Sequence, residues 1–248
     1  MTYRSAARFY DLFGSKNDLN FYRNLAIECG NRALELGVGT ARVAIDLARS
    51  GVMVVGIDNS DDMLSIAKEK LAKEIQSVRS RVILRKGDMR NFSLGQRFPF
   101  IYIPASTFDH NVSVEDRKRA LSCVHKHLEK NGIFAFDLEQ PGVDGPRKSW
   151  WVDREEVEDG KMVVRRIFTV MNEARRTLNL DLFYDVYQDG RHFEGYHEYG
   201  EVGIVSKEEV VELLEDNGFR VDKTYGDFEK SEYREDSAKI VLIAKKRH

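Results

Sequence analysis

The chain has 248 residues, with 39 Lys and Arg against 41 Asp and Glu, so its formal net charge is −2. The opposite charges are interspersed, which argues against a dedicated nucleic-acid groove. No apolar stretch approaches the length of a membrane span, no signal-peptide pattern opens the chain, and Cys29 and Cys123 lack a Cys-x-x-Cys partner. These features predict a soluble, cytoplasmic protein with free thiols, built as one α/β domain with an insert.

An N-terminal helical segment is expected over residues 1–30, where Asn17 or Asp18 caps a helix from Leu19 to Cys29. The most informative segment comes next: an apolar run at residues 32–36 leads into Gly37 and Gly39, and an amphipathic helix follows. The first glycine permits a tight turn, and the second lets the backbone approach a ligand.

Two residues beside this glycine turn bear on the choice of ligand. Arg42 stands where the dinucleotide fingerprint has its third glycine. Glu35, two residues before the first glycine, can hold an ammonium group, which S-adenosylmethionine has and the pyrophosphate of NAD lacks. The pattern therefore favours S-adenosylmethionine as the cofactor.

Two later strand patterns also end in an acid. Residues 52–58 end at Asp58, about twenty residues past the glycine turn, where a carboxylate can accept both ribose hydroxyls of an adenosine. A helix capped by residues 59–62 is expected to run to about Ile75. The strand at residues 82–86 leads into Gly87 and Asp88. These strand ends meet at the edge where open α/β sheets bind ligands.

The remaining elements complete an alternating pattern. A fourth strand at residues 100–106 is followed by a loop with His110, and a helix beginning at Ser113 is expected to close at residues 131–132 before a fifth strand. Asp-Gly turns at residues 159–160 and 189–190 predict two hairpins in an antiparallel meander. A capping box at Ser206 then begins a helix, and two strands end the chain.

We therefore predict a doubly wound α/β fold. Its seven-stranded sheet is mostly parallel, with the last strand antiparallel, and a four-stranded antiparallel meander is inserted after the fifth strand. The expected parts are an N-terminal helical segment (1–30), a Rossmann-like cofactor domain (31–146 and 204–248) and the insert (147–203). The insert is expected to act as an acceptor lid or as a contact in a homodimer, with Trp150 and Tyr184 as candidate substrate contacts.

Residues 35–40, 56–58 and 87–89 resemble the successive motifs of class I S-adenosylmethionine-dependent methyltransferases. Residues 100–106, 130–137, 217–219 and 240–245 resemble the later elements of the class, so the resemblance covers nearly the whole chain except about residues 147–203. Within the class, the chain is most similar to small-molecule N-methyltransferases, such as amino-sugar dimethyltransferases and glycine/sarcosine methyltransferases.

The resemblance implies transfer of a methyl group from S-adenosylmethionine to a nitrogen or oxygen of a small metabolite, giving S-adenosylhomocysteine without a metal. Met63 would cover the adenine or only fill the core. Asp88 would accept from the adenine amino group, beside the Met89 amide, or only cap a helix. The expected cofactor contacts are Tyr10, Glu35, Gly37, Gly39, Thr40, Asp58, Asn59, Met63, Asp88, Met89 and Pro104.

Two residues are candidates for a catalytic role. His110 is the one histidine placed where a general base would be useful, although a hydrogen-bonding role at the surface fits equally well. Residues 9–16 resemble the Tyr-Asp-x-x-Tyr-x-Gly-Lys opening of the amino-sugar N-methyltransferases. Tyr10 and Asp11 match that opening, whereas Phe13 replaces its second tyrosine. The alternative is an aromatic helix packed on the core.

Other functional classes remain open from the sequence. One is an RNA- or protein-modifying methyltransferase with the same cofactor site, for which Arg165-Arg166 and Arg175-Arg176 would be the basic surface. Another is a non-catalytic or NAD(P)-binding Rossmann protein. Binding of S-adenosylhomocysteine but not NADH would separate these alternatives.

Overall fold

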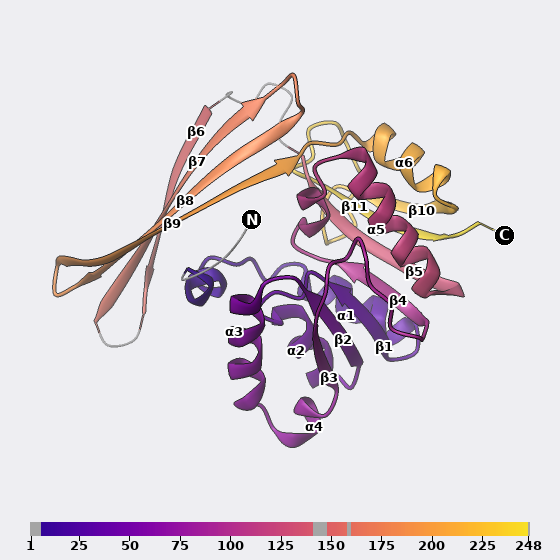
Figure 1. Cartoon of the computed structure of the whole chain (residues 1–248), viewed down its shortest axis with the longest axis horizontal. Coiled ribbons are helices and arrows are strands. Elements are labelled where there is room, and N and C mark those ends of the chain that lie inside the picture. The colour runs from indigo at the N-terminus through magenta and orange to yellow at the C-terminus, as the bar shows by residue number, and fades with distance from the viewer. Residues whose placement is uncertain (1–5, 141–147, 158–159, 248) are drawn as a thin grey trace.

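The computed structural model describes residues 6–140, 148–157 and 160–247. It contains a seven-stranded sheet in the order β10-β11-β5-β4-β1-β2-β3 and a separate four-stranded sheet in the order β6-β7-β8-β9. Figure 1 shows the smaller sheet extending away from the larger one, with the N-terminal segment between them. The predicted fold class is confirmed.

Five parallel strands form the body of the large sheet. Their apolar runs pair in register, for example Leu34 with Val55 and Ile101. The last strand runs antiparallel to both of its neighbours, as expected. The strands are β1 (Arg32–Leu36), β2 (Met53–Asp58), β3 (Val82–Lys86), β4 (Phe98–Ile103), β5 (Leu128–Glu139), β10 (Phe219–Tyr225) and β11 (Lys239–Lys246).

Helices cover both faces of this sheet because alternate strand residues point to opposite sides. One core packs α1, α2 and α3 against side chains such as Val54 and Phe100. The other packs α5 and α6 against side chains such as Leu34 and Ile101. The helices are η1 (Ala7–Leu12), α1 (Leu19–Glu28), α2 (Arg42–Arg49), α3 (Asp61–Ala72), α4 (Gln76–Arg79), η2 (Thr107–His110), α5 (Val114–His127) and α6 (Lys207–Asp216).

Two helix ends differ from the sequence prediction. Helix α3 ends at Ala72 rather than near Ile75, and the short α4 follows it. Helix α5 ends at His127 because Leu128 is extended and pairs with Phe98 of β4. Gly132 is therefore a strand residue, and a Cβ there would lie 2.8 Å from Leu128 Cδ1. Gly132 therefore permits close packing against Leu128, and it does not cap α5.

The four strands of the small sheet confirm the predicted meander. At the second hairpin, Asp189 (φ 52°) and Gly190 (φ 73°) both have the positive φ that a two-residue turn requires; the first turn lies partly outside the described residues. One sheet face packs on η1, where the rings of Phe9 and Tyr184 lie 5.9 Å apart. The strands are β6 (Lys148–Glu156), β7 (Lys161–Asn172), β8 (Thr177–Gln188) and β9 (Arg191–Gly203).

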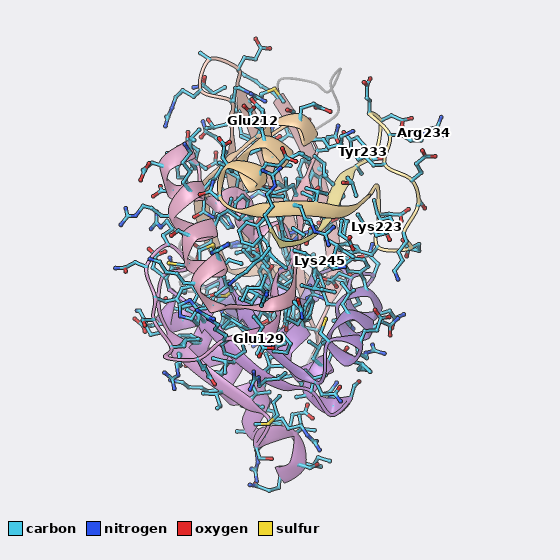
Figure 2. The ribbon with its side chains drawn as sticks, turned by 90° about the vertical axis from the view of Figure 1, so that its right-hand side faces the viewer. Glu129, Glu212, Lys223, Tyr233, Arg234 and Lys245 are labelled. Carbon is cyan, nitrogen blue, oxygen red and sulfur yellow. The ribbon has the colours of Figure 1, made fainter. Side chains whose placement is uncertain are left out.

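Figure 2 shows the edge of the large sheet formed by β10 and β11, which carry Lys223 and Lys245. The loop with Tyr233 and Arg234 projects outward from this edge.

In the described part of the chain, Cys29 and Cys123 are free thiols. None of the described helices is long and apolar enough to cross a membrane.

Candidate active site

A cavity of about 270 Å³ opens at the carboxyl ends of β1, β2 and β3, beside η2 and the N-terminal segment. It brings together eight of the eleven cofactor contacts predicted from the sequence. These are Tyr10, Gly37, Gly39, Asp58, Asn59, Met63, Asp88 and Met89, and His110 lines the same cavity.

The glycine turn forms one wall, and its backbone conformation depends on glycine. Gly37 and Gly39 have φ values of 73° and 52°, which side chains rarely adopt. The Gly37 amide donates to the Ile57 carbonyl at 2.8 Å. A Cβ on Gly37 would lie 2.3 Å from Thr107 Cγ2, so only glycine lets η2 pack this closely on the turn.

The carboxylate of Asp58 is held by the backbone on both sides. Oδ2 accepts from the Gly39 amide and Oδ1 from the Ser60 amide, each at 2.8 Å. Burial raises the pKa of Asp58, and these hydrogen bonds oppose that shift. Each oxygen retains acceptor capacity, so the carboxylate can receive two hydroxyl groups from the cavity. This geometry suits a ribose diol.

Asp88 lies across the cavity and already has a charged partner. Arg90 Nε and Nη2 donate to its two oxygens at 2.9 and 2.6 Å, and this pairing lowers the pKa of Asp88. Arg90 also pairs with Asp116 of α5 at 3.2 Å. The neighbouring Met89 Sδ accepts from Asn111 at 3.3 Å. Asp88 is therefore an anion held in place by Arg90 in the cavity wall.

Glu35 lies beneath the glycine turn and does not line the cavity. It is 1% exposed, and Oε2 accepts from the Tyr102 hydroxyl at 2.7 Å. Burial raises the pKa of Glu35 to about 8, with Tyr102 and Arg42 opposing the shift. The acid is thus largely protonated at neutral pH until a cation approaches.

Thr40 is also buried and anchors the N-terminal segment. Its hydroxyl donates to Asp11 Oδ1 at 2.7 Å, and Lys70 of α3 donates to Asp11 Oδ2 at 2.5 Å. This link holds η1 beside the cavity and places Tyr10 in its lining. Burial raises the pKa of Tyr10 to about 12, so its hydroxyl is protonated at neutral pH.

His110 is the last residue of η2. The chain turns from β4 into η2 at Ala105 (φ 56°) and Ser106 (φ 54°), where positive φ values strain the backbone of these non-glycine residues. Among the described residues, the buried Nδ1 of His110 has no hydrogen-bond partner. Burial lowers the pKa of His110 to about 4. The imidazole is neutral at pH 7 and is able to accept a proton.

Three further predicted residues, like Glu35 and Thr40, are not part of the cavity lining. Pro104 is buried, and its carbonyl accepts from the Thr107 hydroxyl at 2.7 Å. Tyr184 is buried between Phe9 and Phe13 in the small sheet. Trp150 is 59% exposed and pairs with Phe168 on the other face of that sheet.

The cavity also has lining residues that sequence reasoning missed. Ser60 and Gly87 sit inside quoted motifs and were recognisable by position. Thr107 and Asn111 were not, because their contribution depends on how η2 folds back over the strand ends. Arg90 was not either, because its position depends on pairing with Asp88 and with Asp116 of α5. The complete set of missed residues is Ile57, Ser60, Gly87, Arg90, Ala105, Thr107 and Asn111. No cluster of three or more potential metal ligands occurs in the part of the chain that the structure describes.

Residues 33–132 match the family model described as a methyltransferase domain. Glycine/sarcosine N-methyltransferase of Aphanothece halophytica is 24% identical over 91% of this chain and 80% of its own length. dTDP-3-amino-3,4,6-trideoxy-alpha-D-glucopyranose N,N-dimethyltransferase of Streptomyces venezuelae is 24% identical over 66% of each chain. Magnesium-protoporphyrin O-methyltransferase of Rhodobacter capsulatus is 38% identical, but over only 50% of this chain and 52% of its own length.

Solved structures share the fold over nearly the whole chain. The CcbJ methyltransferase from Streptomyces caelestis superposes with a TM-score of 0.83 at 21% identity, covering 98% of this chain and 96% of its own. The S-adenosylmethionine-bound amino pentose methyltransferase CalS10 from Micromonospora echinaspora has a TM-score of 0.75 at 16% identity, covering 99% and 98%.

The domain matched over residues 33–132 and the methyltransferase relatives together indicate that the chain is a methyltransferase. More particularly, it is an S-adenosylmethionine-dependent methyltransferase similar to those that act on small molecules, and the resemblance seen in the sequence is confirmed.

The raised pKa of Glu35 gives a pH-dependent prediction for cofactor binding. An ammonium group near Glu35 favours the ionised acid, so binding releases a proton. Apparent affinity for S-adenosylhomocysteine should therefore rise by up to about tenfold per pH unit between pH 6 and 7.5, below the pKa of about 8. Calorimetry on the wild type and on Glu35→Gln measures this slope. An affinity equally independent of pH in both proteins would show that Glu35 is only structural.

Proposed function

We propose that the enzyme transfers the methyl group of S-adenosylmethionine to the nitrogen of a small amine. The ribose would bind Asp58, the adenine would lie between Met63 and Asp88, and the methionyl part would follow the glycine turn toward η2. The main support for this proposal is that Asp58 and the neutral His110 line the same cavity. The N-methyltransferase relatives support a nitrogen acceptor, and the O-methyltransferase relative keeps oxygen as the alternative.

The chemistry needs little from the side chains. The acceptor nitrogen attacks the methyl carbon as the carbon–sulfur bond breaks, which leaves S-adenosylhomocysteine and a proton to be removed from the nitrogen. Alignment of nucleophile, carbon and sulfur supplies most of the catalysis. His110 is neutral at working pH and would accept the proton, while Tyr10, with its protonated hydroxyl, would orient the acceptor.

The small sheet does not favour a nucleic-acid substrate. Each of the four arginines that would make a basic surface has an acidic partner: Arg165 with Asp153, Arg166 with Asp185, Arg175 with Glu201 and Arg176 with Glu209. Their charge is largely neutralised, so the electrostatic footprint of a polyanion site is weak.

We further propose that residues 147–203 form a lid over the acceptor, held there by η1. Tyr184 would then act through its packing on Phe9, next to Tyr10, and not by direct contact. The exposed Trp150 face remains the candidate for a homodimer contact.

An acceptor panel tests the function. Methyl-labelled S-adenosylmethionine is incubated with glycine, sarcosine and amino sugars, and with hydroxyl analogues of the same shape. We expect label in amines only; label confined to hydroxyl compounds would overturn the nitrogen assignment. His110→Ala should lower kcat by about 10²–10⁴-fold with S-adenosylhomocysteine affinity unchanged. In the wild type, the rate should keep its His110-dependent part until the pH falls through about 4.

A further inference from the structure

A second cavity, of about 340 Å³, lies between the start of α5, the length of α6 and the turn that joins β7 to β8. It shares no lining residue with the cofactor cavity. Figure 2 looks at the molecule from the side of these helices and labels Glu212, one of the lining residues of α6. The cavity is not used by the proposed reaction.

Arg117 is the buried charge in this cavity. The residue is only 8% exposed. Its Nε is covered from solvent and has no hydrogen-bond partner among the described residues, and none of the ion pairs of the described chain involves its guanidinium. A guanidinium offers five N–H donors, and burying it without acceptors is costly. Burial accordingly lowers the pKa of Arg117.

The acids near Arg117 do not neutralise it. Asp109 is buried, and burial raises its pKa well above the usual range, which favours its neutral form. Glu209 accepts from Arg176 and from the Ser206 amide in its capping box. Arg176 also lies near Arg117, and its own charge is paired with Glu209. Asp109 and Glu209 thus favour the charged guanidinium, but neither forms an ion pair with it among the described residues.

At the end of β9, Gly203 packs against the guanidinium of Arg117. A Cβ on Gly203 would lie 2.1 Å from Arg117 Nη2. Glycine at this position lets the strand backbone pack directly against the planar group and keeps it in the cavity wall. Larger side chains here would displace it.

We propose that this cavity binds a small oxyanion, the phosphate or carboxylate group of a metabolite, through Arg117. A planar guanidinium fork recognises either group by paired hydrogen bonds. At the mouth, Lys118 favours an anion, whereas the exposed Glu212 and Asp216 disfavour a polyanion such as RNA. The site is separate from the cofactor cavity, so anion and S-adenosylhomocysteine bind together.

The test uses the whole protein with inorganic phosphate and, in a second arm, acetate, each titrated against chloride at constant ionic strength. We expect one of them to raise Tm saturably, by about 3 °C, because a ligand that binds only the folded state stabilises it. The rise should persist with saturating S-adenosylhomocysteine. The arm that responds shows whether the site takes a tetrahedral or a planar anion.

Substitutions test whether the rise in Tm depends on Arg117. Arg117→Met should lose the rise, whereas Lys126→Met, which removes an exposed charge farther along α5, should keep it. Gly203→Ala leaves Arg117 in the chain but displaces its guanidinium, and it should weaken anion binding at least tenfold. If Arg117→Met does not fold, anion binding by Gly203→Ala tests the proposal in its place. No saturable rise with either anion, or an equal rise in Arg117→Met or Gly203→Ala, would overturn the proposal.

Discussion

Replacing Gly37 by valine is expected to abolish S-adenosylhomocysteine binding in a protein that still folds. Two effects add up at this position. The φ of 73° costs a non-glycine residue about 1–2 kcal/mol. In addition, the new Cβ would lie 2.3 Å from Thr107 Cγ2, so η2 must move away from the turn and open the cavity wall. The combined loss should exceed a hundredfold in affinity, about 2.8 kcal/mol, measured by calorimetry.

Two control variants separate strain from crowding. Gly51 also has a positive φ (93°), but nothing lies within 4 Å of its added Cβ, so Gly51→Ala should cost stability and leave binding intact. Gly37→Ala combined with Thr107→Ala removes the methyl group that crowds the new Cβ, and it should bind better than Gly37→Ala alone. Wild-type affinity in folded Gly37→Val would mean that the loop is only a turn.

The sequence was informative wherever a pattern is local. Apolar runs that end in glycine or an acid located β1, β2 and β3 and their ligand edge, because the carboxyl ends of parallel strands meet there. The capping box at Ser206 and the Asp189-Gly190 turn were predicted for the same reason: a few neighbouring residues determine each of them.

Partnerships between distant residues were not predictable in this way. Asn17 or Asp18 was expected to cap α1. Asp18 occupies the N-cap position, but its side chain makes no capping hydrogen bond, and both its oxygens accept from Arg42 at 2.6 Å. Glu35 is bonded to Tyr102, 67 residues away. Trp150 and Tyr184 were both candidate substrate contacts, but which face of the small sheet packs on η1 depends on tertiary contacts.

Asp58→Ala is expected to give the second large loss, about tenfold to a few hundredfold in S-adenosylhomocysteine affinity. Hydrogen bonds to a charged acceptor contribute about 1.5–3 kcal/mol. The substitution removes the acceptor for the ribose and also leaves the Gly39 and Ser60 amides without their partner. Some stability should therefore be lost as well, without loss of the fold. Asp58→Asn, which keeps one oxygen, should fall between the wild type and alanine.

A ligand analogue assigns the loss to the ribose. The wild type should bind 2′-deoxy S-adenosylhomocysteine more weakly than S-adenosylhomocysteine, whereas Asp58→Ala should bind the two compounds alike, because its hydroxyl acceptor is gone. Asp61→Ala removes an exposed acid three residues further along, on α3, and should leave both affinities unchanged. If folded Asp58→Ala still discriminates between the two compounds as the wild type does, the hydroxyl is held elsewhere, and the orientation proposed for the cofactor is wrong.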